Sequence, residues 1–398
     1  MQTNLKNFAF PAPSLRALTK NHLDHFVKIN GPDHRNLNTW FSTKLVAVAL
    51  PASLDSVLVH QQNHSVPSNS LVGKSLAAHE NASQNVDLPD VNNWTNPPMR
   101  KLHYFVYDVF TKVPLAGNQL GVIPDASGLS GSEMQAIARE LNLAETIFFL
   151  PPEDARHSAK VRIFMPLGEL PFAGHPTIGG AIAYAGINGL PHDVDVILEE
   201  GVGPVHCTVS ADSMGGKSSF TAARLPTQMD LVANDFDVAA ALGLSVDDLD
   251  IGVHQVMMVS GGVPYVTVPV KCPDALARAR VNADAWMALD VWREGKFAAP
   301  YLYCAVGESQ FRVRMFAPWD GIPEDPATGS AAVAFARTLH NYPCQAPGNY
   351  SFHITQGVEM GRRSEIGLSF SVQGAGLSGV SLSGEAVKFA EGTIFLPD

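Results

Sequence analysis

Glu145 is the first residue of this chain whose surroundings suggest proton transfer. It follows the helix-like segment 130–141 and precedes the apolar residues 147–149. A carboxyl group in apolar surroundings is partly desolvated, which raises its pKa and lets it take up and release a proton near neutral pH. The alternative is a solvated glutamate at a strand edge, and the residues alone leave both interpretations open.

A glycine and a histidine mark the start of a predicted helix. Residues 173–177 read Ala-Gly-His-Pro-Thr, so His175 would lie at a helix N-terminus beside Gly174. Glycine lets the backbone approach a ligand closely, and the first turn of a helix has free N–H groups that bind anions. The alternative is that His175 caps the helix or packs against its start.

A second carboxylate precedes another predicted helix start. Residues 324–331 read Glu-Asp-Pro-Ala-Thr-Gly-Ser-Ala, so Asp325 comes just before the helix. The first turn contains Thr328, Gly329 and Ser330, whose unpaired N–H groups would bind a substrate carboxylate or phosphate. The alternative is that Asp325 or Thr328 caps the helix, and both roles are compatible because they use the same donors.

Both helix starts follow a repeated segment. Val-Arg-Ile-Phe-Met-Pro at 161–166 corresponds to Val-Arg-Met-Phe-Ala-Pro at 313–318. A duplicated strand, loop and helix indicates two similar halves that face each other. A cleft between two halves is a favoured place for a small-molecule site. The two loops carry different ionisable groups, so the predicted site is chemically asymmetric, as acid/base chemistry requires.

Short strands alternate with short helices from residue 102 onward. Ser130 and Glu133 form a capping box that predicts a helix through about residue 141. A helix at about 328–340 is so rich in Ala, Val and Phe that it should be buried on all sides, which implies a sheet wrapped around it. Other helices are expected near 176–184, 235–242 and 282–291. Strands are expected near 145–150, 161–165, 194–199, 204–210, 218–224, 254–268 and 300–317.

Composition and charge argue against several classes of partner. The chain has 398 residues, of which 46% are hydrophobic, and a formal net charge of −11. This acidity argues against nucleic acid or an anionic membrane as a partner, and no apolar run reaches the roughly 18 residues that span a bilayer. The four cysteines form no C-x-x-C pair, so neither a metal site nor a disulfide framework is expected, and a cytoplasmic location is the simplest.

The character of the sequence changes near residue 98. Residues 1–98 are rich in Asn and His and contain few periodic segments. We expect a poorly ordered N-terminal extension there, with a small additional domain as the alternative. The folded enzyme would comprise a first half at 99–226 and a second half at 227–389, and the last residues, at about 390–398, would rejoin the first half.

Three motifs in this order resemble the signatures of the PhzF-like family of phenazine-biosynthesis isomerases. They are Asn-Leu-Ala-Glu-Thr at 142–146, Phe-Ala-Gly-His-Pro-Thr at 172–177 and Glu-Asp-Pro-Ala-Thr-Gly-Ser-Ala at 324–331. Shorter matches lie at 107–111, 117–118 and 356–362, so the resemblance covers about residues 102–396. It implies an α+β fold of two pseudo-symmetric diaminopimelate-epimerase-like halves, each a curled, mostly antiparallel sheet around a central helix.

The resemblance also implies a chemistry. The family's glutamate moves a proton between carbons of a cyclic diene acid without a metal or an organic cofactor, and Glu145 matches that glutamate. His175 and Asp325 match its partners. The resemblance assigns substrate binding to Gly174, Thr328, Gly329 and Ser330. A small carboxylate is the expected substrate, and a homodimer is the usual assembly of the family.

The chain departs from the family pattern at two positions. Ala144 replaces a common serine and Gln119 replaces a usual proline, and both changes bear on which substrate is bound. Our leading hypothesis is a cofactor-independent isomerase. The alternatives are an amino-acid-type epimerase or racemase that uses Glu145 and Asp325 from opposite faces, and a ligand-binding relative without catalysis. Neither predicted helix start contains a cysteine, which argues against two-thiol racemisation.

Overall fold

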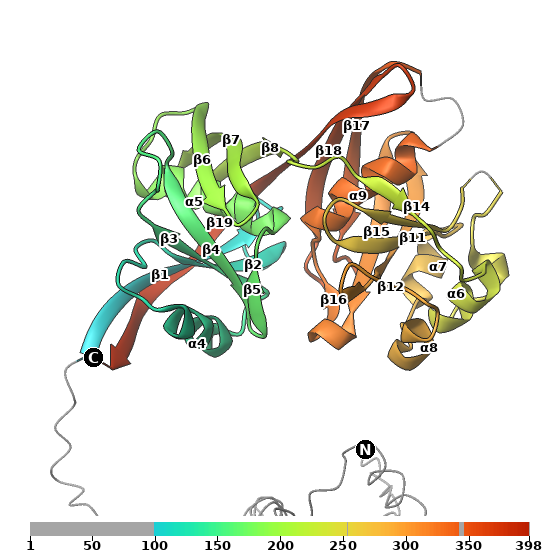
Figure 1. Ribbon diagram of the computed structural model, residues 1–398, viewed down its shortest axis with the longest axis horizontal. Coiled ribbons are helices and arrows are strands. Elements are labelled where there is room, and N and C mark those ends of the chain that lie inside the picture. The colour runs from blue at the N-terminus through green and yellow to red at the C-terminus, as the bar shows by residue number, and fades with distance from the viewer. Residues whose placement is uncertain (1–98, 253, 342–345, 398) are drawn as a thin grey trace, which may run out of the picture. The chain divides into compact units, whose positions relative to one another are not determined.

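A computed structural model describes residues 99–252, 254–341 and 346–397. The predicted N-terminal extension lies outside the described residues. The described residues belong to one compact unit, Asn92–Asp398, whose strands and helices are drawn in Figure 1. Within this described part, no helix is long and apolar enough to cross a membrane.

The first half of this unit consists mainly of strands. Its strands are β1 (Met99–Val109), β2 (Asn118–Ile123), β3 (Glu145–Leu150), β4 (Ala159–Met165), β5 (Gly168–Leu170), β6 (Val194–Glu200), β7 (Gly203–Asp212) and β8 (Gly215–Thr221). Its helices are α4 (Gly131–Leu141) and α5 (Gly174–Ile187). The predicted helix at 176–184 is therefore present, and it begins earlier because proline is tolerated in a first turn.

The second half adds further strands and short helices. Its strands are β9 (Thr227–Met229), β10 (Met257–Ser260), β11 (Pro264–Pro269), β12 (Trp292–Arg293), β13 (Lys296–Phe297), β14 (Ala299–Gly307), β15 (Gln310–Ala317), β16 (Ile322–Asp325), β17 (Gly348–Gln356), β18 (Ser364–Gln373) and β19 (Gly376–Pro397). Its helices are α6 (Asp235–Ala241), η1 (Val246–Asp248), α7 (Pro273–Arg278), α8 (Ala283–Met287), η2 (Pro318–Asp320) and α9 (Gly329–His340). The strands expected near 254–268 are the paired β10 and β11, and the helix expected at 282–291 is the shorter α8.

Hydrogen bonds join the strands of both halves into one sheet. Apart from the β12–β13 hairpin, the described strands form a 17-stranded sheet. β19 gives this continuity because it pairs with β1 and β8 and also with β18. Figure 1 shows it as the long red strand that reaches from β18 to β1. The predicted α+β class is confirmed, but the strands do not divide into two separate sheets.

The helices α5 and α9 are buried along nearly their whole length. α5 packs against β7 and β8, and α9 packs against β18 and β10; both helices also contact β19. A Cβ atom added to Gly179 would lie 2.5 Å from Val109 Cγ2, and one added to Gly180 would lie 2.7 Å from Ile147 Cδ1. Glycine therefore lets α5 approach the strands closely. The prediction that the helix near 328–340 is buried is confirmed.

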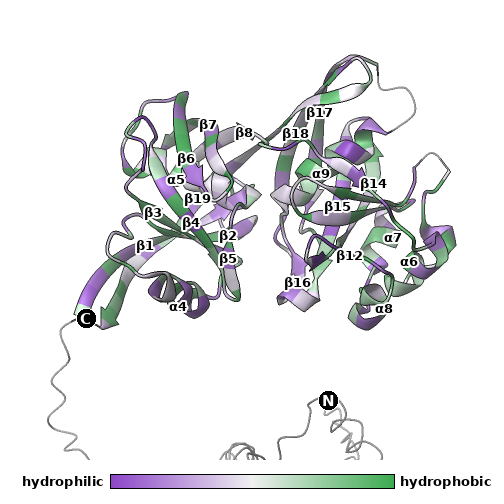
Figure 2. Ribbon diagram, in the orientation of Figure 1, coloured by the Kyte–Doolittle hydropathy of each residue, from purple (hydrophilic) through white to green (hydrophobic). Residues whose placement is uncertain are grey.

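The helix α4 is amphipathic and begins at the predicted capping box. The Ser130 hydroxyl accepts a hydrogen bond from the Glu133 backbone N–H, and the Glu133 carboxylate accepts one from the Ser130 backbone. One face of α4 buries Met134 and Ile137, and Figure 2 shows polar and apolar residues mixed around the helix. Asn142 has a left-handed conformation that ends the helix and turns the chain toward β3.

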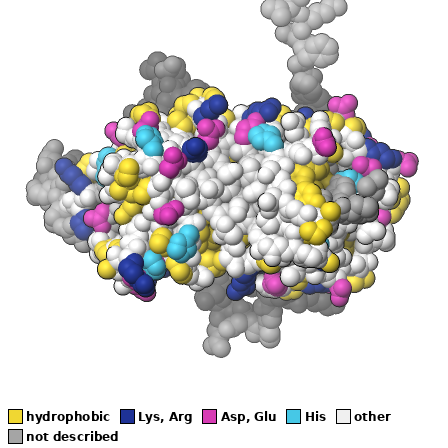
Figure 3. Space-filling model, turned by 90° about the horizontal axis from the view of Figure 1, so that it is seen from above, with side chains coloured by type: hydrophobic (Ala, Val, Ile, Leu, Met, Phe, Trp, Pro, Cys, Tyr) yellow, Lys and Arg dark blue, Asp and Glu magenta, His cyan; other side chains and the backbone are white. Residues whose placement is uncertain are grey.

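Charges on the surface are mixed in sign. On the face seen in Figure 3, basic and acidic side chains are interspersed. Elsewhere in the described residues, charges form pairs at the surface, such as Arg156 with Asp154 and Lys160 with Glu153. An exposed pair contributes at most about 1 kcal/mol to stability, so the buried core must supply most of it.

Candidate active site

Glu145 is the first residue of β3 and lies in the interior. β3 pairs in parallel with β2, with Glu145 opposite Leu120, and only 9% of Glu145 is exposed. Burial raises the pKa of its carboxyl group well above the usual value, and the charge of Asp325 raises it further. Glu145 is thus a desolvated carboxyl group and not a solvated residue at a strand edge.

His175 lies in the first turn of α5 and faces Glu145. Its Nε2 atom is 3.0 Å from the Glu145 Oε2 atom, although the pair does not have hydrogen-bond geometry. Burial lowers the pKa of His175 to about 3, and a hydrogen bond with the backbone of Gln119 opposes this only in part. With this pKa the imidazole is neutral at pH 7, so its contact with Glu145 is not an ion pair.

Asp325 ends β16 and accepts hydrogen bonds on both carboxylate oxygens. Asn118 Nδ2 donates to Oδ1 over 2.8 Å, and Thr328 Oγ1 donates to Oδ2 over 2.6 Å. Burial raises the pKa of Asp325 to about 6, while these two bonds and one with the backbone of Ala327 oppose the rise. At pH 7 Asp325 is therefore mainly ionised, whereas His175 in the other loop is neutral, which is the chemical asymmetry that the two different loops predicted.

Asn118 connects the two predicted helix starts. Besides its bond to Asp325, its Nδ2 atom donates to the Ala327 carbonyl over 2.9 Å and lies 3.4 Å from His175 Nδ1. Its side chain is almost fully buried. Sequence reasoning did not identify Asn118 as a site residue, since an amide has no acid/base role of its own. The Gly-Asn pair at 117–118 in the family resemblance was the one available signal.

Two side chains near the end of the chain hold these loops in place. Gln356 donates from Nε2 to the Asp325 carbonyl over 2.8 Å and to Thr328 Oγ1 over 2.9 Å. Its Oε1 atom accepts from the Thr328 backbone over 3.1 Å. Arg362 donates to the carbonyl of Gly117 over 2.8 Å, which fixes the turn before β2. Sequence reasoning found neither role, although both residues lie in the short family match at 356–362.

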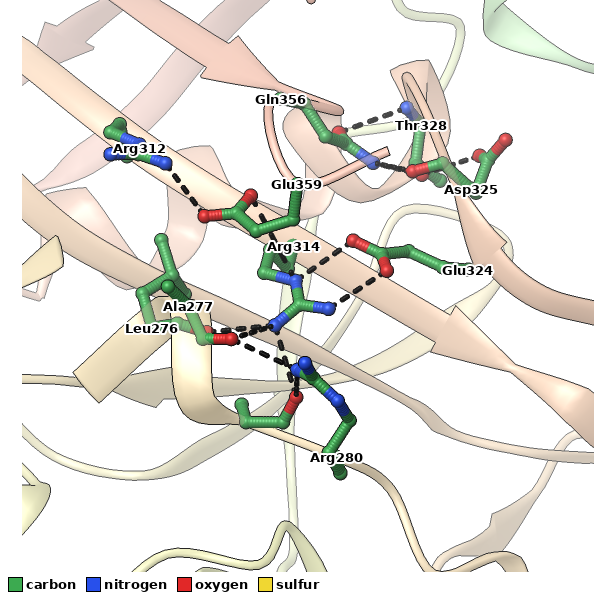
Figure 4. A network of polar contacts seen from close by, with 11 residues as sticks. Leu276, Ala277, Arg280, Arg312, Arg314, Glu324, Asp325, Thr328, Gln356 and Glu359 are labelled. Atoms are coloured by element: carbon green, nitrogen blue, oxygen red, sulfur yellow. Dashed lines mark hydrogen bonds and ion pairs between the residues drawn. The ribbon is translucent and has the colours of Figure 1, made fainter. Parts of the chain in front are cut away.

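Arg314 anchors β16 from the side away from the loops. Its Nε and Nη2 atoms each donate to a carboxylate oxygen of Glu324 over 2.8 Å. Its Nη1 atom donates to the carbonyls of Leu276 and Ala279 at the end of α7. Figure 4 shows this network beside Gln356 and Thr328. Because Glu324 precedes Asp325 on β16, the network fixes the strand that carries Asp325.

The N-termini of α5 and α9 meet backbone to backbone. A Cβ atom added to Gly174 would lie 2.8 Å from the Gly329 Cα atom. Neither helix has a side-chain cap. The side chain of Ala173 has no polar atom, and the Thr328 hydroxyl donates its hydrogen bond to Asp325 instead. The Thr328 side chain therefore does not cap α9. The first-turn N–H groups of both helices remain available to a ligand.

A cavity of about 120 Å³ brings the predicted residues together. Glu145, Asp325, Thr328 and Ser330 line it. His175 is not a lining residue, but it contacts Glu145, which is one. The Gly174–Gly329 contact is formed by residues that are adjacent in the chain to the lining residues Ala173, Thr328 and Ser330. The rest of the wall is largely apolar, and Lys296 is its one basic side chain among the described residues. Tyr265, another lining residue, was not identified from the sequence because it lies inside an ordinary apolar strand.

A larger groove of about 1140 Å³ runs beside β4 and β6. Several of its charged lining residues are paired with one another, such as His157 with Glu199 and Arg162 with Glu169. Paired charges leave little for a ligand to bind. The smaller cavity, which brings the desolvated carboxyl groups of Glu145 and Asp325 together, is the better candidate for an active site.

Comparison with known proteins identifies the family. A family model described as phenazine biosynthesis-like protein (PhzC-PhzF) matches residues 107–392. The chain belongs to this family. It is 45% identical over 302 residues to an uncharacterized isomerase of Mesorhizobium japonicum, an alignment that covers 75% of this chain and 100% of that protein.

Two further similarities place this family member among isomerases. The chain is 35% identical over 296 residues to trans-2,3-dihydro-3-hydroxyanthranilate isomerase of Pseudomonas aeruginosa, covering 74% of this chain and 99% of that protein. Among solved structures, a PhzF-family phenazine biosynthesis protein of Bacillus anthracis matches with a TM-score of 0.67 and 25% identity. That match covers 74% of this chain and 99% of the other. The predicted family and the predicted isomerase class are confirmed.

Proposed function

We propose that this chain is an isomerase that moves a proton along the carbon skeleton of a small carboxylate-bearing substrate, with Glu145 as general base and then general acid. The observation that carries this proposal is the presence of two buried carboxyl groups, Glu145 and Asp325, on the wall of one mostly apolar cavity. A desolvated carboxylate is a stronger base than a solvated one, because burial destabilises its charged form.

The proposed reaction has two proton transfers at Glu145. In the first, a C–H bond of the substrate breaks, the proton moves to a Glu145 oxygen, and the electron pair delocalises into the substrate carboxylate. In the second, Glu145 returns the proton to a different carbon, so the substrate is isomerised and the enzyme is unchanged. A resting Glu145 that favours its protonated form must first lose that proton to solvent or to a neighbouring group, so activity should rise with pH.

The substrate carboxylate would lie against the first turns of α5 and α9. The N–H groups near Gly174, Gly329 and Ser330 point from two helix N-termini, which are sites of partial positive charge. They would stabilise the charge that develops on the carboxylate in the intermediate. Thr328 would act less directly, by keeping Asp325 in place.

His175 and Asp325 would direct the proton. The neutral imidazole of His175 is 3.0 Å from Glu145 Oε2, so a hydrogen bond between the two groups would form once a bound ligand reorients either side chain. The ionised Asp325 keeps the pKa of Glu145 high by repulsion. This repulsion stabilises the protonated form of Glu145 and therefore favours the first transfer, in which Glu145 takes the proton from carbon.

Isotope exchange tests the proposal. The enzyme is incubated in D₂O with trans-2,3-dihydro-3-hydroxyanthranilate, the substrate in the name of the Pseudomonas relative, and deuterium in the product is located by NMR. We expect Glu145→Gln to lower turnover by about 10³-fold or more, because a positioned proton shuttle typically contributes 10²–10⁴-fold. Ligand affinity should change little, since Gln keeps the size and polarity of the side chain.

Glu140→Gln serves as the matched control. Glu140 is an exposed residue of α4, so its replacement should leave turnover unchanged. Near-normal turnover by Glu145→Gln would refute the mechanism. Exchange confined to the α-carbon of an amino acid, with inversion there, would favour the epimerase alternative instead.

A further inference from the structure

Tyr265 places a hydroxyl group in the cavity from a rigid position. It lies on β11, which is hydrogen-bonded on both sides, antiparallel to β10 through Val259 and parallel to β14 through Ala299. Only 5% of the residue is exposed, and it lines the same cavity as Glu145. Neither Tyr265 nor its strand carries any role in the proposed proton transfer.

The hydroxyl group of Tyr265 lies 2.7 Å from the hydroxyl group of Ser330. Two hydroxyl groups carry two protons, and a single hydrogen bond between them uses only one. No other side-chain hydrogen bond of either hydroxyl is found among the described residues. One O–H donor is therefore left over, on the wall of a cavity where an unpaired polar group is costly.

The surroundings keep this spare donor available at all working pH values. Burial raises the pKa of the Tyr265 phenol above its usual value, and the neighbouring carboxyl groups of Asp325 and Glu145 raise it further. The phenol is therefore neutral and can donate. Tyr265, Glu145 and Asp325 line the same cavity.

We propose that Tyr265 and Ser330 together bind an oxygen on the substrate other than the reacting carboxylate, and so select acids that carry a hydroxyl or carbonyl group. This inference rests on the proposed function, because it takes the cavity to be the substrate site, but it concerns binding alone. The carboxylate of such a ligand would occupy the helix N-termini, and its second oxygen would accept the spare hydrogen bond. An acid without that oxygen would leave the donor unpaired, which costs affinity.

Binding of matched ligands to the full-length protein tests the inference. The probes are benzoate and the three monohydroxybenzoates, measured by titration calorimetry or by ligand-observed NMR. We expect the wild-type protein to bind at least one hydroxybenzoate about 5- to 10-fold more tightly than benzoate, which is the range of one neutral hydrogen bond. Tyr265→Phe/Ser330→Ala, which removes both hydroxyl groups, should abolish that preference while retaining the affinity for benzoate within about twofold.

Two further variants separate recognition from a purely structural role. Tyr265→Phe and Ser330→Ala each leave one hydroxyl group with one proton, so each single variant should reduce the preference only in part, because the remaining donor loses the partner that orients it. Tyr184→Phe is the control, since its hydroxyl donates to the Ser158 carbonyl over 2.7 Å away from the cavity. That variant should lose stability comparable to Tyr265→Phe but keep the wild-type preference.

The inference and the proposed function fail in different ways. Equal affinity of the wild-type protein for benzoate and all hydroxybenzoates would overturn the inference, as would a preference that survives in Tyr265→Phe/Ser330→Ala. Either result would leave the Glu145 isotope experiment unaffected. Conversely, normal turnover by Glu145→Gln would refute the proton shuttle without touching the binding preference.

Discussion

Gly174 and Gly329, the first residues of α5 and α9, lie in direct backbone contact. A Cβ atom on either would lie within 3 Å of the other's Cα atom, at 2.8 Å and 2.9 Å. Neither residue has a positive φ, so space and not backbone conformation requires glycine at both positions. The contact keeps two helix N-termini close enough to serve one ligand.

Gly329→Ala should therefore impair the site more than the fold. The added methyl group must push the two helix starts apart, which costs about 1–3 kcal/mol of stability by overpacking. We expect ligand affinity and kcat/KM to fall at least tenfold, since about 1.4 kcal/mol of lost binding is a factor of ten. Titration with benzoate and the isotope-exchange rate measure these losses.

Gly379→Ala is the control for this substitution. An added Cβ at Gly379 on β19 meets nothing within 4 Å, so it should leave affinity and turnover unchanged. Gly174→Ala should resemble Gly329→Ala, and the double variant should be less impaired than the sum because both remove one contact. Wild-type affinity in Gly329→Ala would show that the helix contact does not matter to the ligand.

Asn118→Ala should raise the pKa of Asp325 above its value of about 6. The Asn118 amide donates to Asp325 Oδ1 over 2.8 Å and so favours the ionised form. A hydrogen bond to a charged group contributes about 1.5–3 kcal/mol, and each pKa unit corresponds to about 1.4 kcal/mol, so a rise of about one to two units is expected. Titration of ¹³C-labelled carboxyl groups, with Asp325→Asn for assignment, measures the shift.

Asn188→Ala provides the comparison for the Asn118 experiment. Asn188 donates to the Tyr184 carbonyl at the exposed end of α5, far along the chain from the loops around Asp325. Its replacement should leave the Asp325 titration in place. An unchanged Asp325 pKa in Asn118→Ala would mean that the bond between the two side chains is not formed in solution.

The residues predicted from the sequence share a local signature. Glu145, His175 and Asp325 each lie beside a helix boundary rich in Gly, Pro or Thr, and such boundaries are set by local chain chemistry. The helices α4 and α9 were predicted for the same reason, since a capping box and a dense apolar run act within a few residues. Local rules were sufficient for these parts of the molecule.

Long-range pairing explains what the sequence did not indicate. Asn118 is 207 residues from its partner Asp325, and Tyr265 is 65 residues from Ser330. Each lies in a strand of ordinary composition, and only the sheet brings the partners together. The single sheet was missed for a similar reason, because β19 pairs with β1 across nearly the whole described chain.

Arg314→Ala should destabilise the second half strongly. The guanidinium is only 3% exposed and bonds to both oxygens of Glu324 and to carbonyls at the end of α7, as Figure 4 shows. Removing it leaves the Glu324 carboxylate partly buried without its partner, and breaking such a pair costs about 3–5 kcal/mol. Urea unfolding measures the loss.

Two variants sharpen the Arg314 experiment. Arg156→Ala removes an arginine that is 85% exposed in its pair with Asp154, and it should cost less than about 1 kcal/mol. The double variant Arg314→Ala/Glu324→Ala should be less destabilised than the sum of the two single variants, because each single variant leaves a partner unpaired. Additive losses would indicate that the pair contributes no coupling energy.

Glu200→Gln should make stability less dependent on pH. Glu200 ends β6 beneath the start of α5, where Thr177 Oγ1 donates to its Oε1 over 2.7 Å and its Oε2 has no partner among the described residues. Burial raises its pKa from 4.5 to about 8, so the folded protein holds this proton more tightly than the unfolded chain. The protonated form therefore favours folding, and its contribution is complete below pH 4.5 and is lost between pH 4.5 and 8.

Over that window, the contribution of Glu200 to the free energy of unfolding of the wild-type protein should fall by about 1.4 kcal/mol per pH unit. A glutamine side chain at this position cannot ionise, so Glu200→Gln should gain stability relative to the wild-type protein as pH rises from 5 to 8, measured by urea unfolding at several pH values. The neighbouring Glu199→Gln should show no such trend in this window. The pKa of Glu199 is lowered from 4.5 by hydrogen bonds from the backbone of Glu153 and Asp154, so its ionised form favours folding, and Glu199→Gln should lose a constant amount of stability between pH 5 and 8 that shrinks only below about pH 4.5. Parallel pH curves for wild-type protein and Glu200→Gln would mean that Glu200 is ionised at neutral pH and reaches solvent.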